Sequence, residues 1–340
     1  MAAAQQFGPT EPEVPLPQMR QDVELLEGWP EHSGAPTWML FDPIRNLYFR
    51  VGYDVFQMLS VWSDATLGQV QRTLFAKFQK SVSEDDVSEV VKFLFTHQLT
   101  VDPPEEGFRH FLKQEESTKK SWFNQALHNY LFFRIPLFRP ARFLELSWPV
   151  VESFFSKTAA ILFALLGVLS LYLVSRQWDA FQGQFIAFLS LEGLLYYGAS
   201  LIGVKIIHEL GHAWMATRYG LKVPVIGLAF LVLMPVLYTD TSNAWRLRSR
   251  RQRLMIDGAG IMVELGLAVA ATICWVFLPD GPLRAVMFSI AAVSWIMSLL
   301  INLNPFMRFD GYYILSDLMG FENMQARGFA LAKYRIYTVY

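Results

Sequence analysis

Four long apolar segments in the second half of the chain constrain its fold more than any other feature. A helix needs about 20 apolar residues to cross a bilayer, and within lipid every backbone polar group must find its partner inside the protein. The composition agrees, because 53% of the 340 residues are hydrophobic and only 17% are charged. We therefore expect a mainly α, polytopic membrane protein with about four spans, over Phe154–Val174, Leu191–Trp214, Leu254–Phe277 and Leu283–Leu303.

A fifth apolar run, Val223–Tyr238, is shorter and is interrupted by two prolines and a glycine. Arginines crowd positions 246–253 just after it, and the positive-inside rule places such a loop in the cytoplasm. If the fifth run crossed the membrane, these arginines would face the other side. We therefore predict a re-entrant segment or a membrane-embedded hairpin, whose backbone must pack against protein or line a wet cavity.

The sequence His208-Glu209-Leu210-Gly211-His212 lies inside the second apolar segment. Residues four apart share one face of a helix, so His208 and His212 can reach the same metal ion while Glu209 addresses a water beside it. The pattern is that of the HExxH zinc proteases. The alternative is a pair of hydrogen-bonded core histidines, but ionisable groups in an apolar span are costly and indicate function.

A third metal ligand is predicted after the last apolar segment, at Asp310. Two histidines and one carboxylate leave a fourth position for water, as catalytic zinc requires. Glu209 is then the general base and later the proton donor to the leaving amine. Asn304 is a second catalytic candidate, because its amide can bond the substrate backbone or an oxyanion; capping of the helix before Pro305 is the equal alternative.

Other ionisable residues compete for roles at this site. Asp240 and Glu264 are alternatives to Asp310 as the carboxylate ligand, although Glu264 also suits a protonated structural residue. Asp317 is expected to be solvated. Lys205 precedes His208 on the same helical face, which suggests an aqueous cavity reaching the metal, or a side chain that extends along the helix toward the interface.

The pattern of apolar residues before the membrane part predicts a small α+β, winged-helix-like domain. Two strands, at 37–43 and 46–52, are followed by three helices at 53–62, 66–78 and 83–98. The domain has no Cys or His cluster, no phosphate loop and no basic stripe, so we expect binding rather than chemistry, and no nucleic-acid partner. The N-terminus lacks the features of a secretory signal, which places this domain in the cytoplasm.

The predicted organisation of the chain has five parts. Residues 1–30 form a flexible segment, 31–102 the small domain, 103–148 a linker with an interfacial stretch, 149–325 the membrane-embedded zinc domain, and 326–340 a tail or the start of a further region.

The zinc helix, together with Asn304-Pro305 and Asp310-Gly311 downstream, resembles the site-2 protease family of intramembrane zinc metalloproteases. The resemblance covers roughly Leu191–Leu318. It implies Zn²⁺ held by His208, His212 and Asp310, with a peptide or membrane-protein substrate cleaved near the cytoplasmic side of the bilayer.

More narrowly, Asn129–Leu137 and Asn302–Tyr313 resemble a bacterial branch of peptide zinc metalloproteases of the inner membrane. Its members often carry an N-terminal domain similar to PqqD, a chaperone of ribosomally made peptides, and a C-terminal haemolysin-D-like adaptor. The order of strands and helices over 37–98 is what resembles PqqD. The resemblance implies a peptide-binding domain and an export partner.

Two departures from the family pattern stand out. Gly260 is followed four residues later by Glu264, where site-2 proteases commonly have a small residue or Asn that contacts substrate. The chain also stops at Tyr340 without the adaptor. The alternative to a protease is a non-proteolytic membrane component of a peptide export or modification system, in which the zinc is structural.

Overall fold

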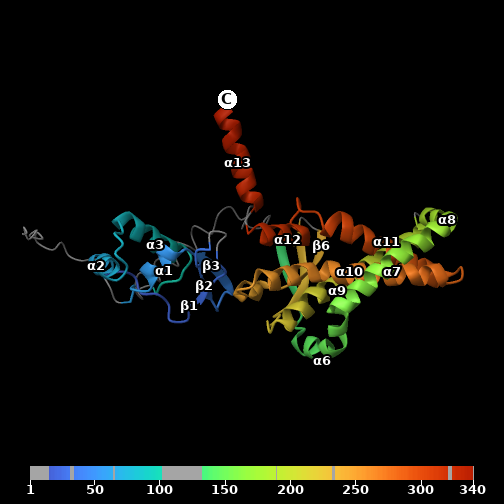
Figure 1. The fold of residues 1–340 in the computed structure, drawn as a ribbon, viewed down its shortest axis with the longest axis horizontal. Coiled ribbons are helices and arrows are strands. Elements are labelled where there is room, and N and C mark those ends of the chain that lie inside the picture. Colours follow the sequence, from blue (N-terminus) through green and yellow to red (C-terminus); the bar gives the residue numbers. More distant parts are fainter. Residues whose placement is uncertain are drawn as a thin grey trace, which may run out of the picture. The chain divides into compact units, whose positions relative to one another are not determined.

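The computed structural model describes residues 15–30, 34–63, 66–101, 132–188, 190–231, 234–320 and 324–339. The chain divides into two compact units, Met1–Leu127 and His128–Tyr340 (Figure 1). Residues 103–131 of the predicted linker and interfacial stretch lie outside the described residues.

The first unit is a small α+β domain. Strands β1 (Glu24–Glu27), β2 (Trp38–Asp42) and β3 (Leu47–Val51) form an antiparallel sheet in the order β1-β2-β3. The helices α1 (Tyr53–Leu59), α2 (Leu67–Phe78) and α3 (Glu84–Thr96) follow. The expected strands and helices are therefore present. Strand β1 corrects the expected flexible segment 1–30, because residues 24–27 pair with β2.

Local sequence signals explain where α2 and α3 begin. Thr66 with Gln69, and Ser83 with Asp86, form capping boxes in which each side chain bonds the other residue's backbone N–H. Each helix then turns an apolar face to the sheet, and Leu74 and Leu94 are completely buried. Leu40 of β2 belongs to the same core.

The second unit is mainly helical. Its longer helices are α6 (Ala141–Val151), α7 (Lys157–Arg176), α8 (Trp178–Phe188), α9 (Leu191–Arg218), α10 (Arg250–Phe277), α11 (Pro282–Ile296), α12 (Asp310–Met319) and α13 (Met324–Val339). Short turns η1 (Glu152–Phe155) and η2 (Ser242–Arg246) connect them, and a π-helical segment, η3 (Met297–Asn302), extends α11. Helix α13 occupies most of the region expected as a tail.

Three helical segments in the described part of the chain are long and apolar enough to cross a membrane: Lys157–Arg176, Arg250–Phe277 and Pro282–Asn302. A fourth span is present if α8 and α9, which meet at an angle of 98°, count as one broken span. The expected number of about four spans is therefore reached only with this bent pair. Helix α10 is the centre of the unit, since it packs against α7, α9, α11 and α12.

A second antiparallel sheet lies within this unit, in the order β4-β5-β6. Strands β5 (Ile226–Leu231) and β6 (Met234–Thr239) make the run at 223–238 a β-hairpin, one of the two forms expected for it. Its partner β4 (Phe132–Phe138) comes from the stretch expected to be interfacial.

Helix α6 also belongs to this unit rather than to a linker. Leu144 is 1% exposed, and Trp214 Nε1 of α9 donates to Ser147 Oγ at 2.8 Å. The second unit therefore begins before residue 149, because β4 and α6 pack on elements that lie much later in the chain.

Candidate metal centre

The two histidines of α9 face helix α10 at a point where the helices approach closely. A Cβ on Gly211 would lie 2.9 Å from the carbonyl oxygen of Ala259, so only glycine allows this approach. His208 and His212 are consequently 3% and 9% exposed. Gly260 of α10 lies directly against both rings, because a Cβ there would sit 2.6 Å from His208 Cε1 and 2.7 Å from His208 Nε2.

The predicted ligands converge. His208 Nε2 lies 3.2 Å from His212 Nε2, and Asp310 Oδ2 lies 3.1 Å from the former and 3.4 Å from the latter. Within the described ranges, these three make up the one cluster of His, Cys, Asp or Glu suited to sharing an ion. In a tetrahedral zinc site with bonds of about 2.0–2.1 Å, ligand atoms stand about 3.3–3.4 Å apart. The triangle fits a zinc ion.

The outer nitrogens of the two rings are each fixed by a different partner. His212 Nδ1 lies 2.7 Å from the carbonyl oxygen of Ile256, and His208 Nδ1 lies 3.2 Å from Glu264 Oε2. Acceptors at both Nδ1 atoms place the protons there and leave the Nε2 lone pairs to face a metal. The donor set thus has the tautomers that zinc binding needs.

Asp310 begins α12, and its neighbour explains how it reaches the histidines. A Cβ on Gly311 would lie 2.5 Å from the carbonyl oxygen of Leu303, so glycine lets α12 start against the end of η3. Asp310 Oδ2 is buried and has no well-aligned hydrogen-bond donor among the described residues, as expected of an oxygen that faces a cation. Burial raises the pKa of the Asp310 carboxyl, but when no metal is bound the protonated imidazoles of His212 and His208 outweigh burial and hold that pKa below its ordinary value.

Glu209 and Asn304, the predicted catalytic residues, have different surroundings. Glu209 is half-buried on α9 beside His208, and its backbone oxygen accepts from Thr239 Oγ1 of β6 at 3.0 Å. Asn304 Oδ1 accepts from the backbone N–H of Phe306 at 2.9 Å, which is a turn contact.

The competing ionisable residues have other partners. Asp240 Oδ1 accepts from Ser242 N at 3.0 Å, in the turn that leads into η2. Asp317 is not simply solvated, because its Oδ2 pairs with Arg253 Nε at 2.8 Å. Lys205 Nζ donates to Asn302 Oδ1 at 3.2 Å and lies 3.7 Å from Glu264 Oε1, so it joins an internal network.

The sequence did not indicate the roles of three residues of this site: Gly260, Ser298 and Asn302. Ser298 and Asn302 are 0% and 2% exposed and both bond Glu264. The available signal was their spacing, because Ser294, Ser298 and Asn302 recur every four residues within an apolar span. Gly260 gave no signal of its own beyond its distance of four residues from Glu264.

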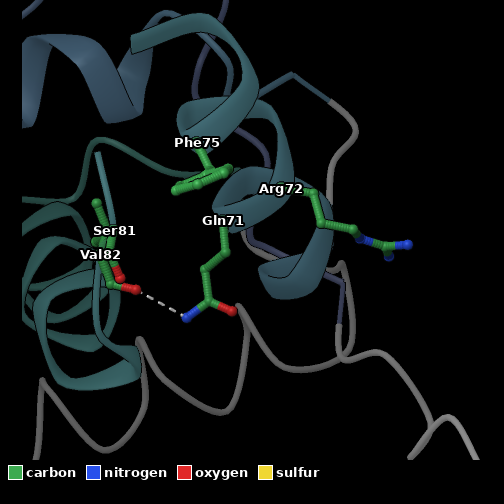
Figure 2. Close-up of a pocket in the computed structure, with 5 residues that line it drawn as sticks. All are labelled: Gln71, Arg72, Phe75, Ser81 and Val82. Carbon is green, nitrogen blue, oxygen red and sulfur yellow. Dashed lines mark hydrogen bonds between the residues drawn. The ribbon is translucent and has the colours of Figure 1, made fainter. Parts of the chain in front are cut away.

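A separate cavity of about 370 Å³ lies in the first unit, between α2 and the segment that follows it (Figure 2). Gln71 Nε2 closes one side by donating to the carbonyl oxygen of Val82 at 3.0 Å, and Phe75 lines the same hollow (Figure 2). With Arg72 and Ser81 as its other lining residues, it offers no metal-binding group.

No curated protein and no solved structure matches the chain. A family model does match part of it. Residues 196–293, which include His208, Glu209, His212, Gly260 and Glu264, match Peptidase family M50. Asp310 lies beyond the matched stretch. The metal-binding helix and the helix packed against it are therefore similar to those of family M50, the site-2 protease family of membrane metallopeptidases.

Proposed function

We propose that this chain is a membrane-embedded zinc metalloendopeptidase that hydrolyses a peptide bond of a peptide or a membrane protein near the cytoplasmic side of the bilayer. The observation that carries the proposal is the triangle of His208 Nε2, His212 Nε2 and Asp310 Oδ2, with Glu209 on the same helix. The family match over 196–293 favours this reading over a structural zinc in a non-proteolytic export component.

Zinc held by these three residues supplies a Lewis acid that activates water and polarises the scissile carbonyl. Glu209 takes the proton of the attacking water and passes it to the leaving amine. Asn304 donates its amide N–H to the substrate backbone or to the developing oxyanion. Because Ile256 and Glu264 fix both imidazoles, the ligands need little rearrangement during this sequence.

Strand β6 offers a place for an extended substrate. It is one of the two edge strands of the described β4-β5-β6 sheet, and Thr239 Oγ1 bonds the backbone oxygen of Glu209. A substrate strand added to this edge would pass beside the general base, with its backbone groups bonded to β6. Extended backbone is also the form in which a peptide carbonyl is accessible to attack.

The decisive experiment compares Glu209→Gln with the wild-type chain in the membrane of an expressing cell. The variant keeps the metal ligands, so purified protein should retain one zinc per chain, while peptides that wild type cleaves should accumulate. Mass spectrometry of those peptides identifies both substrate and cleavage position. Loss of general-base catalysis is expected to lower the rate by roughly 10²–10⁴-fold.

Glu192→Gln is the matched control, because Glu192 is an exposed carboxylate in the first turn of the same helix. It should behave as wild type. A Glu209→Gln chain that keeps its zinc and its full biological activity rejects the proteolytic function and leaves the export or modification component.

We further propose that the first unit binds the peptide that is to be cleaved. Strand β3 is an edge strand of the described sheet, and a cavity of about 420 Å³ lies beside it, between α1 and α3. Its floor is apolar, with Met58 and Phe93, and its rim carries charge of both signs, as at Arg50 and Glu89. This combination suits a peptide strand with mixed side chains.

A photo-crosslinking residue at position 89 tests this in the full-length Glu209→Gln chain. It should capture the peptides that accumulate in that variant. The same probe at Ile44, which is 75% exposed and outside the cavity, should not. Equal capture at both positions refutes a specific groove.

The bacterial inner membrane is the location that we propose, with the first unit in the cytoplasm and a haemolysin-D-like export component as a further partner. The arginine-rich segment at 246–251 supports this orientation. The lipid bilayer itself is the remaining partner, because α7 exposes apolar side chains along its length, including Ile161, Leu165 and Val168.

A further inference from the structure

Glu264 is an acidic side chain with 0% exposure in the middle of helix α10, a candidate membrane span. An unpaired charge at such a depth is expensive, so its partners indicate what it does. Oε2 lies 3.2 Å from His208 Nδ1 and accepts from Ser298 Oγ at 2.9 Å and Asn302 Nδ2 at 2.6 Å. Three donors from two other helical segments therefore meet one carboxylate oxygen.

Lys205 completes this group as its counter-ion. Its ammonium group lies 3.7 Å from Glu264 Oε1 and donates to Asn302 Oδ1 at 3.2 Å. Asn302 therefore bonds the cation through its oxygen and the anion through its nitrogen, which fixes the orientation of the amide. Lys205, Glu264, Ser298 and Asn302 form one network between α9, α10 and η3, which we call the polar network.

The polar network is distinct from the ligand triangle. Glu264 reaches Nδ1 of His208, whereas Asp310 reaches Nε2 of the same ring. One imidazole cannot offer both nitrogens to a single ion, so Glu264 lies outside the coordination sphere. His212 has no such side-chain partner at Nδ1; the Ile256 carbonyl fills that place.

The π-helical form of η3 is what brings two members of the network together. The backbone N–H of Leu303 bonds the carbonyl oxygen of Ser298, five residues earlier. This wider turn lets Ser298 and Asn302 converge on one carboxylate. Isolated π-helical turns inside α-helices occur frequently at functional sites.

We propose that Glu264 is a positioning residue for the metal ligand His208, kept as a buried anion by Lys205 and aligned by Ser298 and Asn302. The proposal rests on the proposed zinc site. Glu264 fixes the ring orientation and tautomer of His208 and raises the basicity of Nε2. Through Ser298 and Asn302, the same carboxylate ties the end of the last span to the metal-binding helix.

The test is cobalt binding by the full-length chain in detergent, since Co²⁺ in a zinc site has visible absorption that reports ligand geometry. Glu264→Gln keeps the shape of the side chain but removes its charge. We expect cobalt affinity to fall roughly 10–100-fold and the visible bands to change in position and intensity. Ser298→Ala, which removes one hydrogen bond to the carboxylate, should cause a smaller change of the same kind.

Thr272→Val is the matched control, because Thr272 is a buried polar residue two turns further along α10. It should leave cobalt affinity and spectrum unchanged. If Glu264→Gln does not yield folded protein, the Ser298→Ala spectrum alone decides.

The outcomes separate this inference from the proposed function. A wild-type chain that binds no cobalt overturns both. A wild-type chain that binds cobalt, with Glu264→Gln giving the same affinity and spectrum, overturns the positioning role alone. A variant that only unfolds at lower temperature, with the wild-type spectrum, shows a structural role and also overturns it.

Discussion

At the candidate metal centre, the glycines that leave room for the ligands matter as much as the ligands themselves. Gly260 has no side chain, and the position of a Cβ there lies against the metal-facing sides of both imidazoles. Gly211 and Gly311 permit the two close approaches that bring α10 and α12 to the histidines. The sequence indicated His208, Glu209 and His212 because their spacing is local. It did not indicate the role of Gly260, which depends on which helix packs opposite.

Replacing Gly260 by Ala should therefore disrupt metal binding without touching a ligand. The added methyl group would lie 2.7 Å from His208 Nε2, so at least one ring must turn away. We expect zinc affinity to fall roughly 10–100-fold, measured as bound zinc per chain in competition with a chelator. Gly258→Ala on the same helix is the control, because its Cβ would make only an ordinary contact of 3.9 Å with Ile314. Equal losses in both variants contradict a local effect.

In the first unit, the carboxyl group of Asp42 should make stability depend on pH. Burial raises the pKa of this carboxyl, but hydrogen bonds from Arg45 and Arg20 outweigh it and hold the pKa below its ordinary value of 3.8. A lowered pKa in the folded state adds stability above the unfolded pKa, and this stability is lost as pH falls through the folded value. Below about pH 4, hydrogen exchange in residues 38–51 of the full chain should therefore accelerate relative to the intrinsic exchange rate at the same pH.

Asp42→Asn should make that acceleration much weaker. It should also lower the free energy of unfolding by about 3 kcal/mol at neutral pH, because two guanidinium groups lose their buried partner. Asp22→Asn is the comparison, since Asp22 pairs with Arg20 but is more exposed. A protein whose hydrogen exchange has the same pH dependence with and without Asp42 excludes this carboxyl as the cause.

Elements differ in how much of them the sequence predicts. The spans α7, α10 and α11 were predictable because hydrophobic length is a local property. The β-hairpin at 223–238 was predicted only as one of two forms, and its partner β4 was missed, because pairing across roughly ninety residues of chain leaves no local pattern. The π-helical turn η3 was also missed, since an apolar run looks the same in either helical form.

Helix α12 carries Asp310, and one ion pair fixes it to α10. Arg253 is 4% exposed and its Nε bonds Asp317 at 2.8 Å. Asp317→Asn removes an anion that bonds this buried guanidinium, so we expect a loss of about 3 kcal/mol in stability. Thermal unfolding in detergent measures this, and zinc binding should weaken as α12 loosens. Asp280→Asn is the control, because Asp280 is 91% exposed beside Arg284. An unchanged unfolding temperature in Asp317→Asn contradicts this role.

At the scale of the whole molecule, the two units differ in how far short sequence patterns predict their structure. The first unit has caps, alternating strands and a single apolar core, all of which short patterns predict. In the second unit α7, α9, α11 and α12 pack on α10, and β6 packs on α9, so the limits of the unit depend on long-range packing. This is why the expected boundary at 149 lies later than the observed one at His128.

The orientation of the chain in the membrane can be tested by labelling cysteines from either side. With Cys274→Ser as background, a cysteine at Arg248 should react with a membrane-impermeant maleimide only after the cytoplasmic side is opened. A cysteine at Asp280, in the short connection between α10 and α11, should react from the outside instead. Labelling of position 248 in intact cells reverses the proposed orientation.

The ligand triangle also joins two parts of the chain that are remote in sequence, because His212 belongs to α9 and Asp310 to α12. A bound ion there acts as a cross-link that closes a long loop through α10 and α11. Folding of the second unit then becomes linked to the concentration of free zinc. At 100 times its dissociation constant, zinc adds about 2.7 kcal/mol to the folded state. If the proposed zinc site is correct, a chain starved of metal would be inactive and also easier to unfold and degrade.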